Sequence, residues 1–315
     1  MSAVQTTDMV RLGASDVYVS QIGLGTWQWG DKMVWGYGNG YNDTHLAAAF
    51  QASLQAGVNF FDTAEMYGFG RSERLLGECI RQTSKPVVVA TKFMPLPYRL
   101  RAADLLKALR ASLERLGLDK VDLYQIHWPM PPVAVETWAD ALADAVEAGL
   151  TRAVGVSNYN EDQMRRAHEM LYRRGLPLAS NQIEFSLIQR KPETTGLLAA
   201  CRELNITPIA YSPLGQGLLT GKYTPDHAPA GARGRKYSKR LLAQIQPLVA
   251  LLRQIGDAHG KTPAQIALAW TVAKGTLPIP GAKNVTQAAS NAAALGLHLT
   301  PNEVDLLDRA SARIA

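Results

Sequence analysis

The chain has 315 residues and a formal net charge of +6, and 47% of its residues are hydrophobic while 19% are charged. This balance excludes a disordered chain, which needs low hydrophobicity and a high density of charge. The mild positive excess favours an anionic small ligand over a nucleic acid or a membrane, because the chain shows neither a basic helix face with interleaved aromatic residues nor an apolar run near the roughly 20 residues of a membrane span.

The first ten residues have neither the positive charge nor the apolar stretch of a secretory signal. Only two cysteines occur, Cys79 and Cys201, which is too few for a disulfide framework. We therefore expect a cytoplasmic protein with both thiols packed in its interior. The next segment, residues 10–20, has the pattern of a small hairpin around a glycine-containing turn.

Eight short apolar runs follow, separated by amphipathic segments with helical spacing such as 102–116, 133–148 and 193–204. This alternation favours parallel strands joined by crossover helices. Eight repeats in about 300 residues predict an α/β fold with a single (β/α)8 TIM barrel over residues 1–315, its bottom capped by the hairpin at 10–20. The predicted strands are 22–25, 58–61, 87–91, 121–126, 153–156, 181–185, 208–211 and 276–279.

The segment that follows the seventh predicted strand, residues 212–240, is long, rich in glycine and proline, and basic toward its end. Loops of this length are usually functional or disordered. We expect a mobile clamp over an anionic ligand, because Gly215, Gly217 and Gly221 permit close backbone approach. The alternative is a solvated basic loop without contact to a ligand.

Polar side chains stand at the carboxyl ends of most predicted strands, where (β/α)8 enzymes carry their active sites. Asp62, Lys92 and His127 follow three successive strands, and Tyr67 comes five residues after Asp62. A buried Lys92 needs a counter-charge, which Asp62 on the neighbouring strand can supply. The Lys92 ammonium is expected to lower the pKa of Tyr67 toward a useful range, and His127 can donate a hydrogen bond to a substrate oxygen.

Taken one at a time, each of these residues also has a structural interpretation. Asp62 and Lys92 can form an ion pair without chemistry, Tyr67 can be a tyrosine on the rim, and a histidine at a strand end can simply be hydrogen-bonded. Their occurrence together on consecutive strands favours catalysis. No His-x-His or His-Glu-x-x-His pattern occurs, so we expect no catalytic metal.

Four tryptophans lie near the predicted strand ends and suggest an apolar or aromatic substrate pocket, although some of them can simply cover the barrel rim. They are Trp27, Trp29, Trp35 and Trp128, while Trp138 and Trp270 fall in helical segments and are expected in the core.

At these residues the chain resembles the aldo-keto reductase family. The similarity rests on Gly-Leu-Gly-Thr-Trp at 23–27, Phe-Asp-Thr-Ala-Glu-Met-Tyr-Gly at 61–68, Ala-Thr-Lys at 90–92 and Asp-Leu-Tyr-Gln-Ile-His at 122–127. Further matches lie at 155–158, 181–182, 211–214, 217–223 and 279–281, in the order of the family and over nearly the whole chain. Residues 27–31, 35–38 and 279–284 are similar to plant-plastid and cyanobacterial members, some of which are described as pyridoxal reductases.

The resemblance implies a catalytic tetrad of Asp62, Tyr67, Lys92 and His127, with Tyr67 as the general acid and NADP(H) as the cofactor. The implied substrate contacts are Trp27, Tyr67, His127 and Trp128. The implied cofactor contacts are Gly25, Thr26, Trp27, Asp62, Ser157, Asn158, Gln182, Tyr211, Ser212, Pro213, Leu214, Gln216, Gly217, Lys222, Ile279, Pro280, Gly281, Ala282, Lys283, Gln287 and Asn291.

Within this implied cofactor site, Asn158 and Gln182 hold the nicotinamide carboxamide and Tyr211 stacks on its ring. Lys283 stands where members place a cation for the adenosine 2′-phosphate. Gln287 is a departure from the family, as is Ser290 beside Asn291, because many members carry glutamate at these two positions.

The predicted function is the NADPH-dependent reduction of an aldehyde or ketone to an alcohol. One alternative is a regulatory or sensor subunit that binds NADPH with little turnover. Another is a cofactor-free lyase that uses Lys92 as a Schiff base, against which the expected Asp62 partner argues. The sequence leaves the physiological carbonyl substrate and the oligomeric state open.

Overall fold

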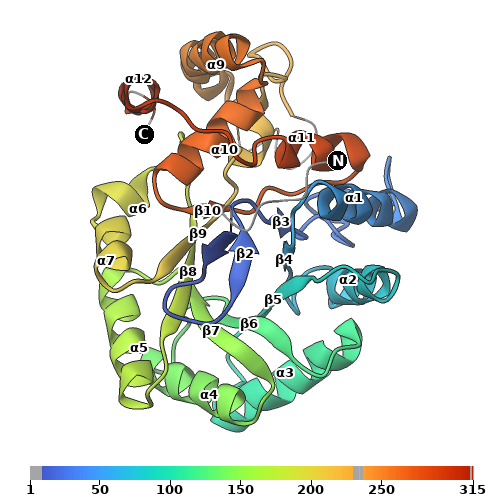
Figure 1. The fold of residues 1–315 in the computed structure, drawn as a ribbon, viewed down its shortest axis with the longest axis vertical. Coiled ribbons are helices and arrows are strands. Elements are labelled where there is room, and N and C mark those ends of the chain that lie inside the picture. Colours follow the sequence, from blue (N-terminus) through green and yellow to red (C-terminus); the bar gives the residue numbers. More distant parts are fainter. Residues whose placement is uncertain (1–8, 230–233, 235–236, 313, 315) are drawn as a thin grey trace.

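The computed structural model describes residues 9–229, 234, 237–312 and 314. Parallel strands β3 to β10 follow one another around a curled sheet in chain order (Figure 1). The sheet closes because the Gly23 amide donates to the Pro278 carbonyl at 2.9 Å and the Gly25 amide donates to the Pro280 carbonyl at 3.2 Å. The predicted (β/α)8 barrel is therefore confirmed. Its strands are β3 (Leu24–Gly25), β4 (Phe60–Asp62), β5 (Val88–Phe93), β6 (Val121–Ile126), β7 (Thr151–Ser157), β8 (Leu178–Glu184), β9 (Thr207–Tyr211) and β10 (Leu277–Pro278).

The helices form a ring outside the sheet, and α9 packs on the outer side of α10 together with α12 (Figure 1). Helix α3 illustrates why the helices pack against the sheet: its buried residues recur at helical spacing from Leu105 to Leu116 and form one apolar face. Gly117 ends the helix with a φ of 68°. The bounds are α1 (Asp43–Gln55), α2 (Arg71–Arg81), α3 (Ala102–Leu116), α4 (Val135–Glu147), α5 (Glu161–Arg173), α6 (Lys191–Thr194), α7 (Leu197–Glu203), the 3-10 helix η2 (Gly215–Thr220), α9 (Lys239–His259), α10 (Pro263–Ala273), α11 (Val285–Ala292) and α12 (Pro301–Ser311).

Capping boxes begin three of the helices. Asn160, Thr262 and Thr300 each accept a hydrogen bond from the backbone amide three residues later, and the glutamine or glutamate there accepts from the amide of the cap. A side-chain cap of this kind contributes about 1 kcal/mol to stability. The cap at Thr262 also fixes where α10 starts, beside the carboxyl ends of the strands.

Two predictions about chain segments are corrected. The helical pattern at 193–204 forms two helices, α6 and α7, because Gly196 takes a left-handed φ of 81° between them. The predicted loop at 212–240 contains η2, and α9 begins at Lys239, so Lys239 and Arg240 belong to a helix. Three of the five basic residues of this stretch, Arg233, Arg235 and Lys236, lie outside the described residues.

The predicted hairpin is present as β1 (Met9–Arg11) and β2 (Tyr18–Ser20), which pair antiparallel. It covers the amino ends of the strands: the Gly13 amide donates to Thr207 Oγ1 at 2.8 Å and the Ser20 amide to Asn59 Oδ1 at 2.7 Å. The view in Figure 1 looks onto this end, with the hairpin in front of the strands. Both contacts place the hairpin at the bottom of the barrel, so the opposite end stays open.

Alternation along the strands places a polar layer above an apolar one inside the barrel. The lower layer includes Phe60, Leu123 and Ile209, which pack with the hairpin. Every second side chain of a strand points into the barrel. The inward-facing positions that come after the lower layer are polar. That upper layer holds Asp62, Lys92, Gln125, Ser157, Gln182 and Tyr211.

In the part of the chain that the structure describes, no helix is both long and apolar enough to cross a membrane. Cys79 and Cys201 are buried free thiols, in α2 and α7.

Candidate active site

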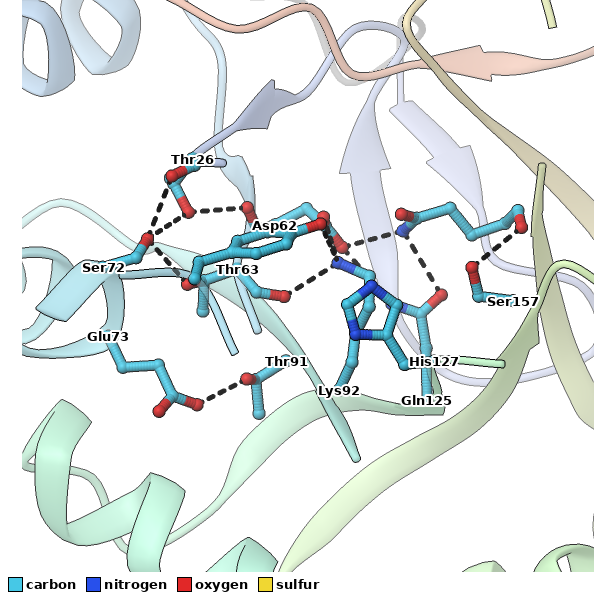
Figure 2. Close-up of polar contacts among 12 residues, drawn as sticks. Thr26, Asp62, Thr63, Ser72, Glu73, Thr91, Lys92, Gln125, His127 and Ser157 are labelled. Atoms are coloured by element: carbon cyan, nitrogen blue, oxygen red, sulfur yellow. Dashed lines mark hydrogen bonds and ion pairs between the residues drawn. The ribbon is translucent and has the colours of Figure 1, made fainter. Parts of the chain in front are cut away.

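A fully buried ion pair lies at the centre of the polar layer. Lys92 Nζ lies 2.5 Å from Asp62 Oδ1, and the two side chains are 0% and 2% exposed. The same ammonium donates to the Thr63 carbonyl at 2.8 Å (Figure 2). It also faces Tyr67 Oη at 3.4 Å. These three contacts match the three protons of an ammonium. The pair therefore joins the end of β4 to the middle of the site and points one donor at the Tyr67 hydroxyl.

The second oxygen of Asp62 accepts from two amides. Gln182 Nε2 donates to Asp62 Oδ2 at 2.8 Å, and Gln125 Nε2 donates to the same atom at 3.3 Å. Burial lowers the pKa of Lys92, while the charges of Asp62 and Glu73 act in the opposite direction. The carboxylate thus offsets much of the cost of burying the ammonium.

Tyr67 does not follow the expectation for its pKa. Burial raises the pKa of Tyr67 well above its ordinary value of 10.0, and the charge of Asp62 adds to that rise. The prediction that Lys92 lowers this pKa is wrong for the protein without ligands, because the Lys92 charge is offset by Asp62 and the hydroxyl is desolvated. Tyr67 is therefore protonated at neutral pH, which is the form a proton donor needs.

His127 lies next to Tyr67, with ring centroids 5.7 Å apart. Its amide donates to the Phe93 carbonyl at 2.8 Å and its carbonyl accepts from Asn158 Nδ2 at 3.0 Å, so the backbone at the end of β6 is held from both sides. Burial and the nearby Lys92 charge lower the pKa of His127 to about 3. The ring is neutral at physiological pH and carries a single N–H to donate.

The loop that carries Tyr67, residues 63–70, is fixed by a buried glutamate that sequence reasoning did not single out. Glu65 Oε1 accepts from the Met94 amide at 2.7 Å and from Arg99 Nη1 at 2.5 Å. This contact ties the loop to the segment just after Lys92. Its signal in the sequence is an acidic residue three positions past a strand-end aspartate.

The site opens into a cavity of about 750 Å³. The four predicted substrate contacts, Trp27, Tyr67, His127 and Trp128, line it. All predicted cofactor contacts line it except Ala282, which is fully buried and whose carbonyl accepts from Trp29 Nε1 at 3.2 Å. Lys92 does not line the cavity itself, but it contacts two residues that do, Asp62 and Tyr67.

Three of the predicted nicotinamide contacts are hydrogen-bonded to the protein or to each other. Tyr211 Oη donates to Asn158 Oδ1 at 2.9 Å, and Gln182 donates to Asp62 as described above. Asn158 has a left-handed φ of 63°, as do Ser212 at 51° and Gln216 at 55°. Non-glycine residues in this region are uncommon and mark constrained positions, here along the wall of the cavity.

Lys283 lines the same cavity and lies just before the start of α11. Its ammonium donates to the Trp35 carbonyl at 2.9 Å and lies 4.4 Å from the Tyr41 ring centroid. Its amide donates to Gln287 Oε1 at 2.9 Å, and Asn291 Nδ2 donates to the Gly281 carbonyl at 3.2 Å. The predicted adenosine-binding residues therefore lie together around residues 281–291.

The aromatic cluster predicted at the mouth is present in part. Trp27 packs edge-on against Trp35 at 5.6 Å and lies 6.4 Å from Tyr67 in a stacked arrangement, and all three line the cavity. Trp29 is fully buried instead. As predicted, Trp138 and Trp270 belong to the core.

Several lining residues were missed by sequence reasoning because they come from loops and helix starts rather than strand ends. Thr262 is the cap of α10, and a cap next to the last strand was the available signal. The residues missed as cavity contacts are Gln28, Met66, Thr220, Thr262, Ala264, Thr286 and Ser290.

Comparison with known proteins decides the family. Residues 21–312 match the model of the Aldo/keto reductase family. The chain belongs to this family. It is an oxidoreductase, in agreement with relatives that are named as reductases.

One relative, the chloroplastic pyridoxal reductase of Arabidopsis thaliana, is 43% identical over 299 residues, which are 90% of this chain and 81% of the relative. A glycerol dehydrogenase from Gluconobacter oxydans has a similar structure, with a TM-score of 0.87, 29% identity and coverage of 99% and 97% of the two chains. An aldo/keto reductase from Klebsiella pneumoniae, crystallised with NADP and acetate, has a TM-score of 0.74 at 29% identity, covering 96% and 94%.

Proposed function

We propose that this aldo/keto reductase reduces an aldehyde or ketone to the alcohol, with NADP(H) as its redox cofactor and residues 1–315 working as one barrel domain. The observation that carries the proposal is the buried chain of contacts from Asp62 through Lys92 to Tyr67, at 2.5 Å and 3.4 Å. It ends at a protonated hydroxyl in the wall of a cavity of about 750 Å³.

The cavity suits a dinucleotide by the chemistry of its lining. Its lining offers the Asn158 and Gln182 amides and the Tyr211 ring, which match a carboxamide and an aromatic ring. It also offers the Lys283 ammonium, which matches a phosphate. Positive φ angles at Ser212, Gln216 and Gly217 turn the backbone of 212–217 along the cavity wall, where backbone amides can hold a pyrophosphate.

When bound, the reduced nicotinamide supplies a hydride for the carbonyl carbon. Tyr67 donates its phenolic proton to the carbonyl oxygen, so the oxygen leaves as a neutral alcohol. The Lys92 ammonium, 3.4 Å from Tyr67 Oη, stabilises the phenolate that this transfer produces. The neutral His127 ring donates its single N–H to the same carbonyl oxygen and orients it. Proton transfer of this kind typically contributes about 10²–10⁴-fold to the rate.

The lyase alternative is weakened by the state of Lys92. A Schiff base requires an unprotonated amine that reaches the substrate, whereas Lys92 is fully buried against Asp62 and does not line the cavity. The regulatory alternative is compatible with the same geometry, and only turnover separates it from the enzyme.

Pyridoxal is the first substrate to try, because the relative from Arabidopsis thaliana is named for its reduction. The test follows NADPH absorbance with purified protein and a panel of aldehydes and ketones that includes pyridoxal. Turnover with at least one of them supports the proposal. NADPH binding without turnover on any of them would favour the regulatory alternative. The cytoplasmic location stays a prediction.

A further inference from the structure

A second cleft of about 670 Å³ lies beside the candidate active site, between residues 30–33 and the loop at 66–69. Met66 lines both this cleft and the active-site cavity, so the two hollows share a wall. Two further apolar side chains of the cleft, Met33 and Phe69, are 86% and 83% exposed, while Leu75 is buried beneath them. Large apolar side chains exposed next to a cavity mark a binding surface when they cluster.

The backbone at Phe69 gives a second reason to look for a function. Phe69 has a left-handed φ of 55°, between Gly68 at 56° and Gly70 at 79°. Gly68 is required there, because a Cβ would meet the Gly30 backbone at 2.9 Å. Glycine or asparagine would suit the position of Phe69 better than a bulky residue does. An exposed phenyl on a strained backbone gains nothing from burial, and such strain is concentrated at functional sites.

The charges around the cleft indicate what it can take. Its lining contains three acidic and three basic side chains, so it has no net charge: Asp31, Asp43, Glu78, Lys32, Arg71 and Arg74. Arg71 is held by Asp43 Oδ2 at 2.8 Å and by Tyr37 Oη at 2.9 Å. An anionic tail that binds Arg71 would have to displace this ion pair, and the balanced charges of the lining give an anion no net attraction. An uncharged apolar tail needs only Met33, Met66 and Phe69.

We propose that this cleft is a distal subsite for the substrate, which takes the uncharged apolar tail of a carbonyl compound whose reactive end lies at Tyr67. The inference rests on the proposed carbonyl reduction. Met66 is the point where the tail leaves the active-site cavity, and Phe69 and Met33 cover it further out. The enzyme then prefers carbonyl compounds with extended apolar tails over short ones of equal reactivity.

The experiment measures kcat/KM for unbranched aldehydes from butanal to decanal in the wild type, Phe69→Asn, Met33→Ser and the control Tyr172→Asn. Tyr172 is an exposed aromatic residue on α5 that lines neither hollow. Burial of a methylene is expected to raise kcat/KM by about fourfold for each carbon that enters the cleft. Phe69→Asn and Met33→Ser should lower kcat/KM for decanal about tenfold or more while butanal and the control stay within twofold. Asparagine suits the left-handed backbone, so the thermal midpoint of Phe69→Asn should equal or exceed that of the wild type.

Binding of 1-decanol and 1-butanol, followed by tryptophan fluorescence, separates this inference from the proposed function. If no aldehyde is turned over but 1-decanol still binds and Phe69→Asn weakens that binding, the proposed reduction is refuted and the cleft as a subsite for apolar tails is supported. Turnover with no dependence on chain length, or equal losses for butanal and decanal in Phe69→Asn, refutes the cleft and leaves the proposed reduction standing.

Discussion

Asp62→Asn removes the negative charge that faces the Lys92 ammonium and leaves the shape of the site almost unchanged. In the wild type the two charges lie 2.5 Å apart with side chains 0% and 2% exposed. Removing one member of a buried pair typically costs about 3–5 kcal/mol, because the other charge stays buried without compensation. We expect a loss of this size in the free energy of unfolding at pH 7 for Asp62→Asn, and a similar loss for Lys92→Met.

The double variant Asp62→Asn/Lys92→Met should be more stable than the sum of the two losses predicts, by about 2 kcal/mol or more. Neither buried charge remains in it, so each substitution removes the penalty that the other creates. The wild type, both single variants and the double variant form a complete cycle in urea denaturation at pH 7.

The pH dependence of the unfolding free energy tests the same set of variants in a second way. The pKa of Lys92 in the folded protein lies below its ordinary value of 10.5 because burial outweighs the attraction of Asp62. Without Asp62 this pKa falls further. At pH values between the pKa of Lys92 in the folded protein and 10.5, the unfolded chain binds more protons than the folded one. The free energy of unfolding therefore rises with pH in this range. The deficit of Asp62→Asn against the wild type should therefore shrink between pH 7 and pH 10. Additive losses within about 0.5 kcal/mol, or a deficit independent of pH, would refute the buried pair as described.

Three further predictions concern the cavity. Lys283→Met should weaken NADPH binding about tenfold or more but NADH binding less than threefold, because only the 2′-phosphate needs that charge; equal losses in fluorescence titration would show that Lys283 does not read the phosphate. The pKa of His127 is lowered to about 3 in the folded protein, so the unfolded chain binds more protons than the folded one between pH 6.5 and 3. On lowering the pH from 8 to 5, the wild type should therefore lose about 2 kcal/mol of unfolding free energy relative to His127→Gln, measured by urea denaturation. An unchanged difference between the two proteins would contradict a neutral buried ring. Hydrogen exchange across 212–221 should slow when NADPH binds, and slowing that extends into 237–240 would favour the clamp interpretation over a solvated basic loop.

The barrel itself was predictable because it depends on local signals. Eight apolar runs with helices between them allow few other folds, and the alternation along each strand places Asp62 and Lys92 on the same inner surface. The strand bounds differ from the predicted ones by three residues at most, as at the start of Leu178–Glu184, where the first residues have no strong strand preference. Gly196, which splits a predicted helix, acts through a left-handed φ that the apolar pattern does not reveal.

Features that depend on loops distant in sequence were not predictable. The contact of Lys283 with the Trp35 carbonyl joins segments 248 residues apart. The second cleft arises where the segment near Met33 meets the loop with Phe69. The direction of the pKa shift of Tyr67 was also missed, because it depends on how completely the hydroxyl is desolvated and how well Asp62 offsets Lys92.

The measurement that tests the proposed chemistry most directly is the turnover of Tyr67→Phe on an aldehyde that the wild type reduces. Phenylalanine keeps the ring beside Trp27 and His127 but removes the hydroxyl that faces Lys92 Nζ at 3.4 Å. We predict that kcat falls about 100-fold or more while the dissociation constant for NADPH stays within twofold. Near-native turnover in Tyr67→Phe would contradict Tyr67 as the proton donor.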